Sequence, residues 1–293
     1  MTREAFLSTI AALSGLLFVV GSMLATGLSL TVAQIVQPLK NARLVILALL
    51  ANFVLVPLLA FAITRVIPLD QALQIGLIVL STVAGAPFLV KEVQAAQGDL
   101  SLGVGLMFML MVVTIFYVPV VLPLLLAGVE VNPWDIAKSL IVTMLIPIVL
   151  GLMYRSHSAE GAQQWAPVLN KASGVALLLM LVTGLGLNLS NIIDLIGSFG
   201  FLALILFVVG SLLIGMLLGG RDPAVRSVLG LGTAQRNVAA AILVTSLNFP
   251  GTMTLPFILV ASIILPLILI PTARMLGRRA ADPAAPQPAT TEK

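Results

Sequence analysis

The sequence predicts an all-α integral membrane protein of about nine transmembrane helices, arranged as inverted repeats with two broken helices. Three observations support this fold class. Of the 293 residues, 60% are hydrophobic and only 9% are charged, with a mean hydropathy of +1.17, whereas soluble domains carry about 25% charged residues. The apolar residues form runs of the roughly 20 residues that a helix needs to span a bilayer. Two of these runs are interrupted by Gly, Pro or polar residues.

Charged, Pro and Gly residues divide the chain into nine predicted spans. The first span follows Arg3, but its apolar stretch is long and no small-residue cleavage site follows it, so we expect a retained helix rather than a signal peptide. The lipid bilayer is therefore the expected surrounding of most of the chain. The spans cover approximately residues 5–30, 42–66, 71–97, 99–127, 135–154, 167–189, 197–219, 223–248 and 254–276.

Basic residues between the spans predict the orientation, because Lys and Arg concentrate in cytoplasmic loops. With the N-terminus outside and the C-terminus in the cytoplasm, the outer segments carry only Arg3, Arg65 and Lys138. The inner segments carry Lys40, Arg43, Arg155, Lys171, Arg221, Arg226, Arg274, Arg278 and Arg279. We expect a multi-pass protein of the inner (plasma) membrane. This bias also accounts for the net charge of +4, so nucleic acid is not an expected partner.

An offset of five spans relates the two halves of the chain. The first repeat covers about residues 5–127 and the second about 135–276, and the odd offset places the copies upside down relative to each other. Inverted repeats with broken helices at corresponding positions recur in secondary transporters. We expect one transmembrane domain over residues 1–276. The Pro- and Ala-rich residues 277–293 predict a disordered cytoplasmic tail.

The first broken span contains Gly85-Ala86-Pro87. Pro87 removes a backbone donor and clashes with the preceding turn, so the helix should kink or unwind there. Freed backbone groups at membrane depth are tolerated only where they line a cavity or are buried in protein. Lys91 and Glu92 follow within about one turn. Lys91 either extends to the membrane interface or faces the site, and the sequence leaves both readings open.

The second broken span holds Thr233, Gln235, Arg236 and Asn237 in an apolar run. Arg236 lies roughly 15 Å beyond Arg226 if the segment is helical, close to the bilayer midplane, where a charge is disfavoured by about 2.5–3.5 kcal/mol on insertion scales. Two interpretations follow. The guanidinium either is satisfied by backbone carbonyls or by an acidic side chain (Glu92) and holds helices together, or binds an anionic substrate through its planar fork.

Several segments, taken in order, resemble the bile acid:sodium symporter family and its bacterial relatives. Gly27-Leu28-Ser29-Leu30 follows the first span, and residues 51–61 contain Asn-Phe-x-x-Val-Pro-Leu-Leu-Ala-Phe, similar to a family motif that begins Gln-Phe. Residues 232–237 lie where the family has Glu-Thr/Val-Gly-x-Gln-Asn. This resemblance implies a panel domain and a core domain, with the two broken helices crossing at the centre of the core.

The chain departs from this family at the residues that bind sodium. The resemblance implies that the crossing helices of family members hold two sodium ions. The ligands are an acidic residue, a Gln, and the side chains of Ser, Asn and Thr. Here the acidic position is Gly232, the Gln position is Arg236, and the Ser-Asn stretch reads Phe88-Leu89-Val90. Only Asn237 and Thr233 carry over as sodium ligands, which argues against sodium binding in the family's manner. Our hypothesis is that Arg236, together with Lys91, supplies fixed positive charge in its place.

The sequence as a whole favours a secondary transporter that moves a small organic anion by alternating access. Transport would be uncoupled, coupled to protons through Glu92, or an exchange of anions. The alternatives are a transport-inactive membrane sensor and an efflux carrier of a related fold. An enzyme, a metal site and a cofactor are not expected, because the chain has no Cys and its one His, His157, lies in a polar loop. The candidate site residues are Arg236, Gln235, Asn237, Thr233, Lys91, Glu92 and Pro87.

Overall fold

The computed structural model describes residues 3–126, 132–187 and 198–281, and within these ranges the chain is almost entirely helical, with no strand. Eight helices in these ranges are long and apolar enough to cross a membrane. The remaining predicted span, residues 71–97, consists of two shorter helices separated by a non-helical stretch. The prediction of an all-α integral membrane protein is confirmed.

Seven of the nine predicted spans are continuous in the described part of the chain. Five of them are single α-helices, namely α1 (Arg3–Ser29), α7 (Leu100–Leu125), α10 (Ala159–Leu187), α12 (Gly200–Leu218) and α15 (Thr254–Ala281). The other two each contain a short π-helical turn, in the orders α3 (Ala42–Leu50), η2 (Ala51–Leu55), α4 (Val56–Val66) and α8 (Pro133–Leu140), η3 (Ile141–Leu145), α9 (Ile146–His157). A short connection, α2 (Val32–Val36) and η1 (Gln37–Lys40), links α1 to α3.

Two helix boundaries differ from the predicted ones. Helix α10 begins at Ala159 rather than near residue 167 and continues through Pro167. The polar residues before Pro167 resemble a loop, but Ala162 and Ala166 pack against Leu28 of α1, so tertiary contact keeps this turn helical. Helix α15 continues to Ala281, and the remainder of the predicted tail lies outside the described residues.

The two broken spans are each formed by a pair of half-helices. Helix α5 (Gln71–Thr82) ends before a non-helical stretch, residues 83–88, and α6 (Leu89–Ala95) follows. Helix α13 (Pro223–Ala234) ends before residues 235–237, and α14 (Val238–Asn248) follows. The glycines of the second span, Gly230 and Gly232, stay helical within α13, so the break lies just after them. We call residues 83–88 the first break and residues 235–237 the second break.

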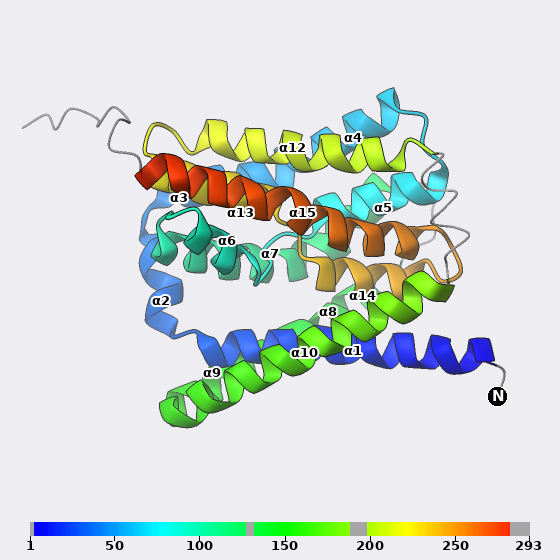
Figure 1. Cartoon of the computed structure of the whole chain (residues 1–293), viewed down its shortest axis with the longest axis horizontal. Coiled ribbons are helices and arrows are strands. Elements are labelled where there is room, and N and C mark those ends of the chain that lie inside the picture. Colours follow the sequence, from blue (N-terminus) through cyan, green and yellow to red (C-terminus); the bar gives the residue numbers. More distant parts are fainter. Residues whose placement is uncertain (1–2, 127–131, 188–197, 282–293) are drawn as a thin grey trace, which may run out of the picture.

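The helices divide into two groups that lie side by side (Figure 1). The flanking group consists of α1, α8–η3–α9 and α10, in which α1 packs along both α9 and α10. The crossover group consists of the remaining helices and contains both breaks. Within the flanking group, α1 and α9 approach closely at Gly27 and Gly151. A Cβ atom added at Gly27 would overlap the carbonyl oxygen of Ile148, and one at Gly151 would overlap the backbone of residues 24–28.

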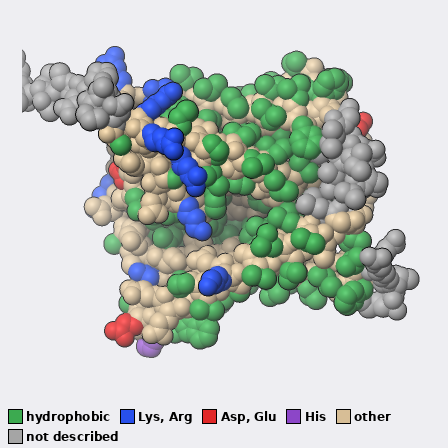
Figure 2. Space-filling model, viewed as in Figure 1, with side chains coloured by type: hydrophobic (Ala, Val, Ile, Leu, Met, Phe, Trp, Pro, Cys, Tyr) green, Lys and Arg blue, Asp and Glu red, His purple; other side chains and the backbone are tan. Residues whose placement is uncertain are grey.

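The outer surface is apolar, as a bilayer requires. Hydrophobic side chains are concentrated on the right half of the face shown in Figure 2, and Lys and Arg side chains gather on its left half. A water-facing surface with this much contiguous apolar area would drive association. Large side chains at least half exposed include Leu17, Leu58, Val120, Leu124, Val182, Leu217 and Leu267.

Candidate functional site

The two breaks are hydrogen-bonded to each other at the centre of the crossover group. The backbone N–H of Asn237 donates to the carbonyl of Val83 at 3.2 Å, and the side-chain Nδ2 of Asn237 donates to the carbonyl of Gly85 at 3.1 Å. The guanidinium of Arg236 donates to the carbonyl of Ser81 at 3.2 Å. The half-helices therefore meet at their interrupted ends, which is the crossing that the family resemblance implied.

Asn237 serves both breaks at once. Its Oδ1 accepts from the backbone N–H of Ala240 at 3.1 Å and thereby caps the N-terminus of α14, which an Asn does well because its side chain replaces a missing helical acceptor. Its Nδ2 satisfies the freed carbonyl of Gly85. The side chain is 1% exposed. One buried amide thus starts a half-helix and fixes its position against the first break.

The first break is stabilised by α7 as well. The hydroxyl of Thr114 accepts from the backbone N–H of Ala84 at 2.9 Å and donates to the carbonyl of the same residue at 3.1 Å. Gly85 has a φ of +76°, in the left-handed region that glycine favours, and a Cβ there would overlap the backbone of Met111. Both backbone polar groups of Ala84 are therefore satisfied within the protein.

Arg236 is fully buried and its two terminal nitrogens are occupied by oxygen acceptors. Nη2 donates to the carbonyl of Thr233 at 2.6 Å and to Oδ1 of Asn52, while Nη1 donates to the carbonyl of Ser81. The Nε–H has no hydrogen-bond partner in the described part of the chain. The sequence offers either backbone carbonyls or Glu92 as partners of Arg236, and the structure shows backbone carbonyls. The oxygens of Glu92 do not bond to the guanidinium.

Asn52 is the partner that the sequence analysis missed. It lies in η2, is 1% exposed, and its Nδ2 donates to the carbonyl of Ala48 at 3.0 Å and to the hydroxyl of Thr233 at 3.4 Å. The available signal was that Asn52 is the single polar side chain between Arg43 and Thr64. A lone amide within an apolar span indicates an internal partner or a site.

The π-turn that presents Asn52 has a clear local cause. Pro57 follows η2 and has no N–H, so it cannot donate to the carbonyl of Phe53 four residues earlier. The hydroxyl of Tyr117 on α7 donates to that carbonyl at 2.6 Å instead. The rings of Phe53 and Tyr117 also lie 4.7 Å apart. Helix α7 therefore supports both the π-turn and the first break.

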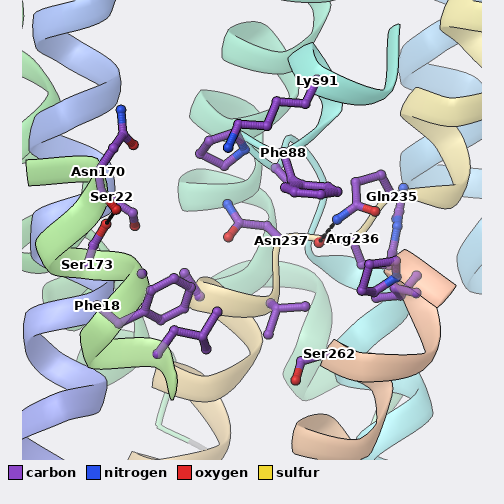
Figure 3. A pocket seen from close by; sticks show the side chains of 18 residues that line it. Phe18, Ser22, Phe88, Lys91, Asn170, Ser173, Gln235, Arg236, Asn237 and Ser262 are labelled. Atoms are coloured by element: carbon purple, nitrogen blue, oxygen red, sulfur yellow. Dashed lines mark hydrogen bonds between the residues drawn. The ribbon is translucent and has the colours of Figure 1, made fainter. Parts of the chain in front are cut away.

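A cavity of about 350 Å³ lies where the two helix groups meet, next to both breaks. Figure 3 shows side chains of the flanking group on one side and those of the crossover group on the other. The flanking wall provides Phe18, Ser22, Asn170, Ser173, Gly174 and Leu177. The crossover wall provides Ala86, Pro87, Phe88, Lys91, Gln235, Arg236, Asn237, Val238, Ala239, Ser262, Leu265 and Pro266.

The structure brings most of the predicted site residues together. Pro87, Lys91, Gln235, Arg236 and Asn237 line the cavity. Lys91 is exposed, with its ammonium 5.8 Å from the centre of the Phe88 ring, and its side chain reaches toward the cavity in Figure 3.

Thr233 and Glu92 do not line the cavity. Thr233 lies two residues before the second break, and its carbonyl accepts from Arg236 and its hydroxyl from Asn52. Glu92 is 1% exposed on α6, and neither of its carboxylate oxygens has a hydrogen-bond partner in the ranges that the structure describes. Sequence reasoning also missed the flanking wall, whose Ser22, Asn170 and Ser173 lie in helices that read as ordinary apolar spans.

Comparisons with known proteins agree with this architecture. Residues 15–195, more than half of the chain, match the model of the Sodium Bile acid symporter family. The chain is similar to a protein of Oryza sativa subsp. japonica named "Probable sodium/metabolite cotransporter BASS3, chloroplastic", with 22% identity over 232 residues, which are 77% of this chain and 55% of the relative. The protein of the same name in Arabidopsis thaliana is 24% identical over 175 residues, 59% of this chain and 41% of the relative.

The chain spans about half the length of these curated relatives. The family match, the membrane-spanning helices and the two breaks that meet at their ends all point the same way. The chain belongs to the sodium bile acid symporter family.

Proposed function

We propose that this transporter moves a small organic anion across the inner (plasma) membrane by alternating access between the flanking group and the crossover group. The observation that carries the proposal is the cavity between the two groups. The residues that line it in the described part of the chain include Lys91 and Arg236 but no Asp or Glu. A site with this charge favours an anion, and the volume of about 350 Å³ lies at the small end of ligand pockets.

Within this site we assign contact with the anion to Lys91 rather than to Arg236. The terminal nitrogens of Arg236 already donate to protein oxygens, so its charge acts on a ligand through space. Lys91 has three donors on a flexible stem and does not bond to the oxygens of Glu92. Gln235, whose Oε1 has no partner in the described residues, adds an acceptor for a hydroxyl or amide on the ligand.

The remaining lining indicates an organic body on the anion. Phe18 and Leu177 of the flanking wall and Phe88 and Leu265 of the crossover wall give the cavity apolar lining on both sides. Apolar lining with a few polar groups is the usual composition of a small-molecule site. Because the walls belong to different helix groups, a relative displacement of the groups would open the cavity to one side of the membrane and close it to the other.

Flux measurements test the proposal directly. The purified protein in liposomes should take up at least one labelled monocarboxylate, dicarboxylate or sulfonate, first selected by an increase in melting temperature. Lys91→Gln should raise KM by roughly 10-fold or more, because hydrogen bonds to charged groups contribute about 1.5–3 kcal/mol. Its melting temperature should not fall, since the ammonium is exposed.

Lys171→Gln is the matched control. Lys171 is an exposed lysine of α10 that does not line the cavity, so its KM should equal that of the wild type. An equal KM for Lys91→Gln and wild type would contradict the assigned role. Tight anion binding without any flux would instead support the alternative function, a membrane sensor.

We infer that the N-terminus lies outside and the C-terminus in the cytoplasm. The chain has no cysteine, so single cysteines report position without a background. In intact cells an impermeant maleimide should label Asp70→Cys, in the exposed turn between α4 and α5, but should label Arg221→Cys, in the exposed turn between α12 and α13, only after permeabilisation. The reverse pattern would overturn the orientation.

A further inference from the structure

We propose that the guanidinium of Arg236 is a built-in cation, which occupies the oxygen cage at the crossing and leaves no place there for a dissolved sodium ion. The cage consists of the carbonyl oxygens of Ser81 and Thr233 and the Oδ1 of Asn52. This inference concerns how the crossing is held together. It stands whether or not the proposed anion transport is confirmed.

The three oxygens form a set that an alkali cation would use. In transporters, coupling ions are held by carbonyls of unwound backbone and by the C-terminal ends of half-helices. Ser81 lies in the last turn of α5 and Thr233 in the last turn of α13. Both carbonyls are therefore at the negative ends of helix dipoles. The third oxygen, from Asn52, is a neutral amide and belongs to a different span.

The cage is filled by protein rather than open to an ion. Arg236 is 0% exposed, and both terminal nitrogens bond to cage oxygens. A sodium ion that competed for the same oxygens would meet a like charge a few ångströms away in a medium of low dielectric constant, where the repulsion is strong. Glu92, the one buried carboxylate among the residues that the structure describes, does not bond to the guanidinium and so does not neutralise it directly. The residues present thus do not fit sodium at this position.

A tethered cation has a different consequence from a dissolved one. Through its three acceptors Arg236 joins the span α5–α6, the span α13–α14 and the span α3–η2–α4. A dissolved ion would make these links only when it is bound, whereas a covalently attached guanidinium makes them at every sodium concentration. The crossing should therefore be equally stable with and without sodium.

The first test needs no variant. The melting temperature of the wild-type protein in detergent is measured in sodium, potassium and choline chloride at equal ionic strength. We expect the same value in all three, because an ion that does not bind the native state does not raise its melting temperature. A saturable rise with sodium that potassium and choline do not produce would overturn the inference.

The second test empties the cage. Arg236→Ala should lower the melting temperature by about 5–15 °C, since three buried oxygens lose their donors, and methylguanidinium at millimolar concentration should restore part of the loss by occupying the vacated space. Arg278→Ala, which removes an exposed arginine near the C-terminal end of α15, is the control and should respond to methylguanidinium as the wild type does. Equal responses in the two variants would contradict the inference.

A double variant and a flux measurement complete the design. Arg236→Ala combined with Asn52→Leu removes a cage oxygen, so rescue by methylguanidinium should be lost. If Arg236→Ala does not fold, the comparison of ions on the wild type still decides the question. Uptake of any transported anion should continue unchanged when choline replaces sodium. A failure to find any transported anion would count against the proposed function alone, since the inference is read from melting temperatures.

Discussion

The two breaks meet at the same point but differ in what they offer, because the first presents hydrogen-bond acceptors and the second presents donors. The first break, residues 83–88, reads Val-Ala-Gly-Ala-Pro-Phe and has no side chain that donates or accepts a strong hydrogen bond. It presents the carbonyls of Val83 and Gly85 as acceptors. The second break reads Gln-Arg-Asn, and its backbone and side chains supply donors. Acceptors from one break are therefore paired with donors from the other.

This difference explains how a non-helical backbone can persist at membrane depth. An unpaired amide or carbonyl in an apolar environment costs about 2–7 kcal/mol, depending on the reference state. Two breaks of the same composition would compete for the same partners, whereas an acceptor-rich and a donor-rich break satisfy each other. The two halves thus correspond in the position of their breaks but differ in chemistry. The inverted repeat itself stays a prediction.

Gly85→Ala should have the largest effect on stability, because it disturbs the backbone conformation of the acceptor-rich break. The change combines an unfavourable positive φ with overlap on Met111, and together these should destabilise the fold by about 2–6 kcal/mol. The measurements are the yield of monodisperse protein in detergent and its melting temperature.

Gly186→Ala is the control for this substitution, since a Cβ at that position of α10 meets no atom within 4 Å. It should leave both measurements unchanged. A Gly85→Ala protein as stable as Gly186→Ala would show that the first break is not fixed by its glycine.

Asn237→Ala should follow, because it removes both the cap of α14 and the donor to Gly85. We expect a loss of about 2–4 kcal/mol from an unpaired buried carbonyl and a lost cap. Asn237→Asp keeps the acceptor for Ala240 but loses the donor to the carbonyl of Gly85. It should therefore retain the cap of α14 without reaching the stability of the wild type. Denaturant or thermal unfolding in detergent reports the difference.

A second asparagine provides the comparison. Asn248 donates only to Val244 within its own helix and is half-buried. Asn248→Ala should therefore cost at most about 1 kcal/mol. If the two alanine variants lost the same amount, the crossing would not depend on the amide that joins the breaks.

Thr114→Val should have a smaller effect than either change within the breaks. It preserves the shape of the side chain but removes the hydroxyl that pairs with both backbone groups of Ala84. The expected loss is about 1–3 kcal/mol. Thr114→Ser retains the hydroxyl and should stay within about 1 kcal/mol of the wild type. Equal melting temperatures for the Val and Ser variants would argue that the first break needs no support from α7.

Tyr117→Phe should have the smallest effect, because it acts on the second break through the π-turn that holds Asn52. Loss of the hydrogen bond to the carbonyl of Phe53 should cost about 0.5–1.5 kcal/mol. Tyr154→Phe, at an exposed tyrosine of α9, should change stability by less than about 0.5 kcal/mol. A larger loss for Tyr154→Phe than for Tyr117→Phe would contradict the assigned support.

The sequence predicts much of this fold because a membrane span can be recognised from the composition of a short continuous segment. Charged loops and Pro or Gly interruptions separate the nine spans, and Gly85 with Pro87 indicates the first break directly. The second break also lies in the predicted span, at three of the polar residues that the sequence singles out there, Gln235, Arg236 and Asn237. Gly230 and Gly232, just before it, stay helical and allow close packing instead, because a Cβ at Gly230 would overlap Met216 of α12 and one at Gly232 would press on Leu89 of α6.

The site is less predictable because its contacts join residues that are far apart in the sequence. Arg236 stands out as a buried charge, but its partner Asn52 is 184 residues away, and no local pattern pairs them. Similarly, Ser22 and Asn170 line the cavity only because α1 and α10 pack together opposite the breaks. The sequence identified the residues that carry unusual chemistry, and the fold was needed to assign the direction of each side chain.

The contact between Gly27 and Gly151 has a mechanical consequence. Where two helices touch backbone to backbone, neither can slide or rotate past the other without a collision of main-chain atoms, as the overlaps with Ile148 and with residues 24–28 indicate. Helices α1 and α9 should therefore move together as one rigid unit. Any displacement that exposes the cavity to the opposite side of the membrane would then be concentrated at the boundary along α7, α14 and α15, where the flanking group contacts the rest of the molecule.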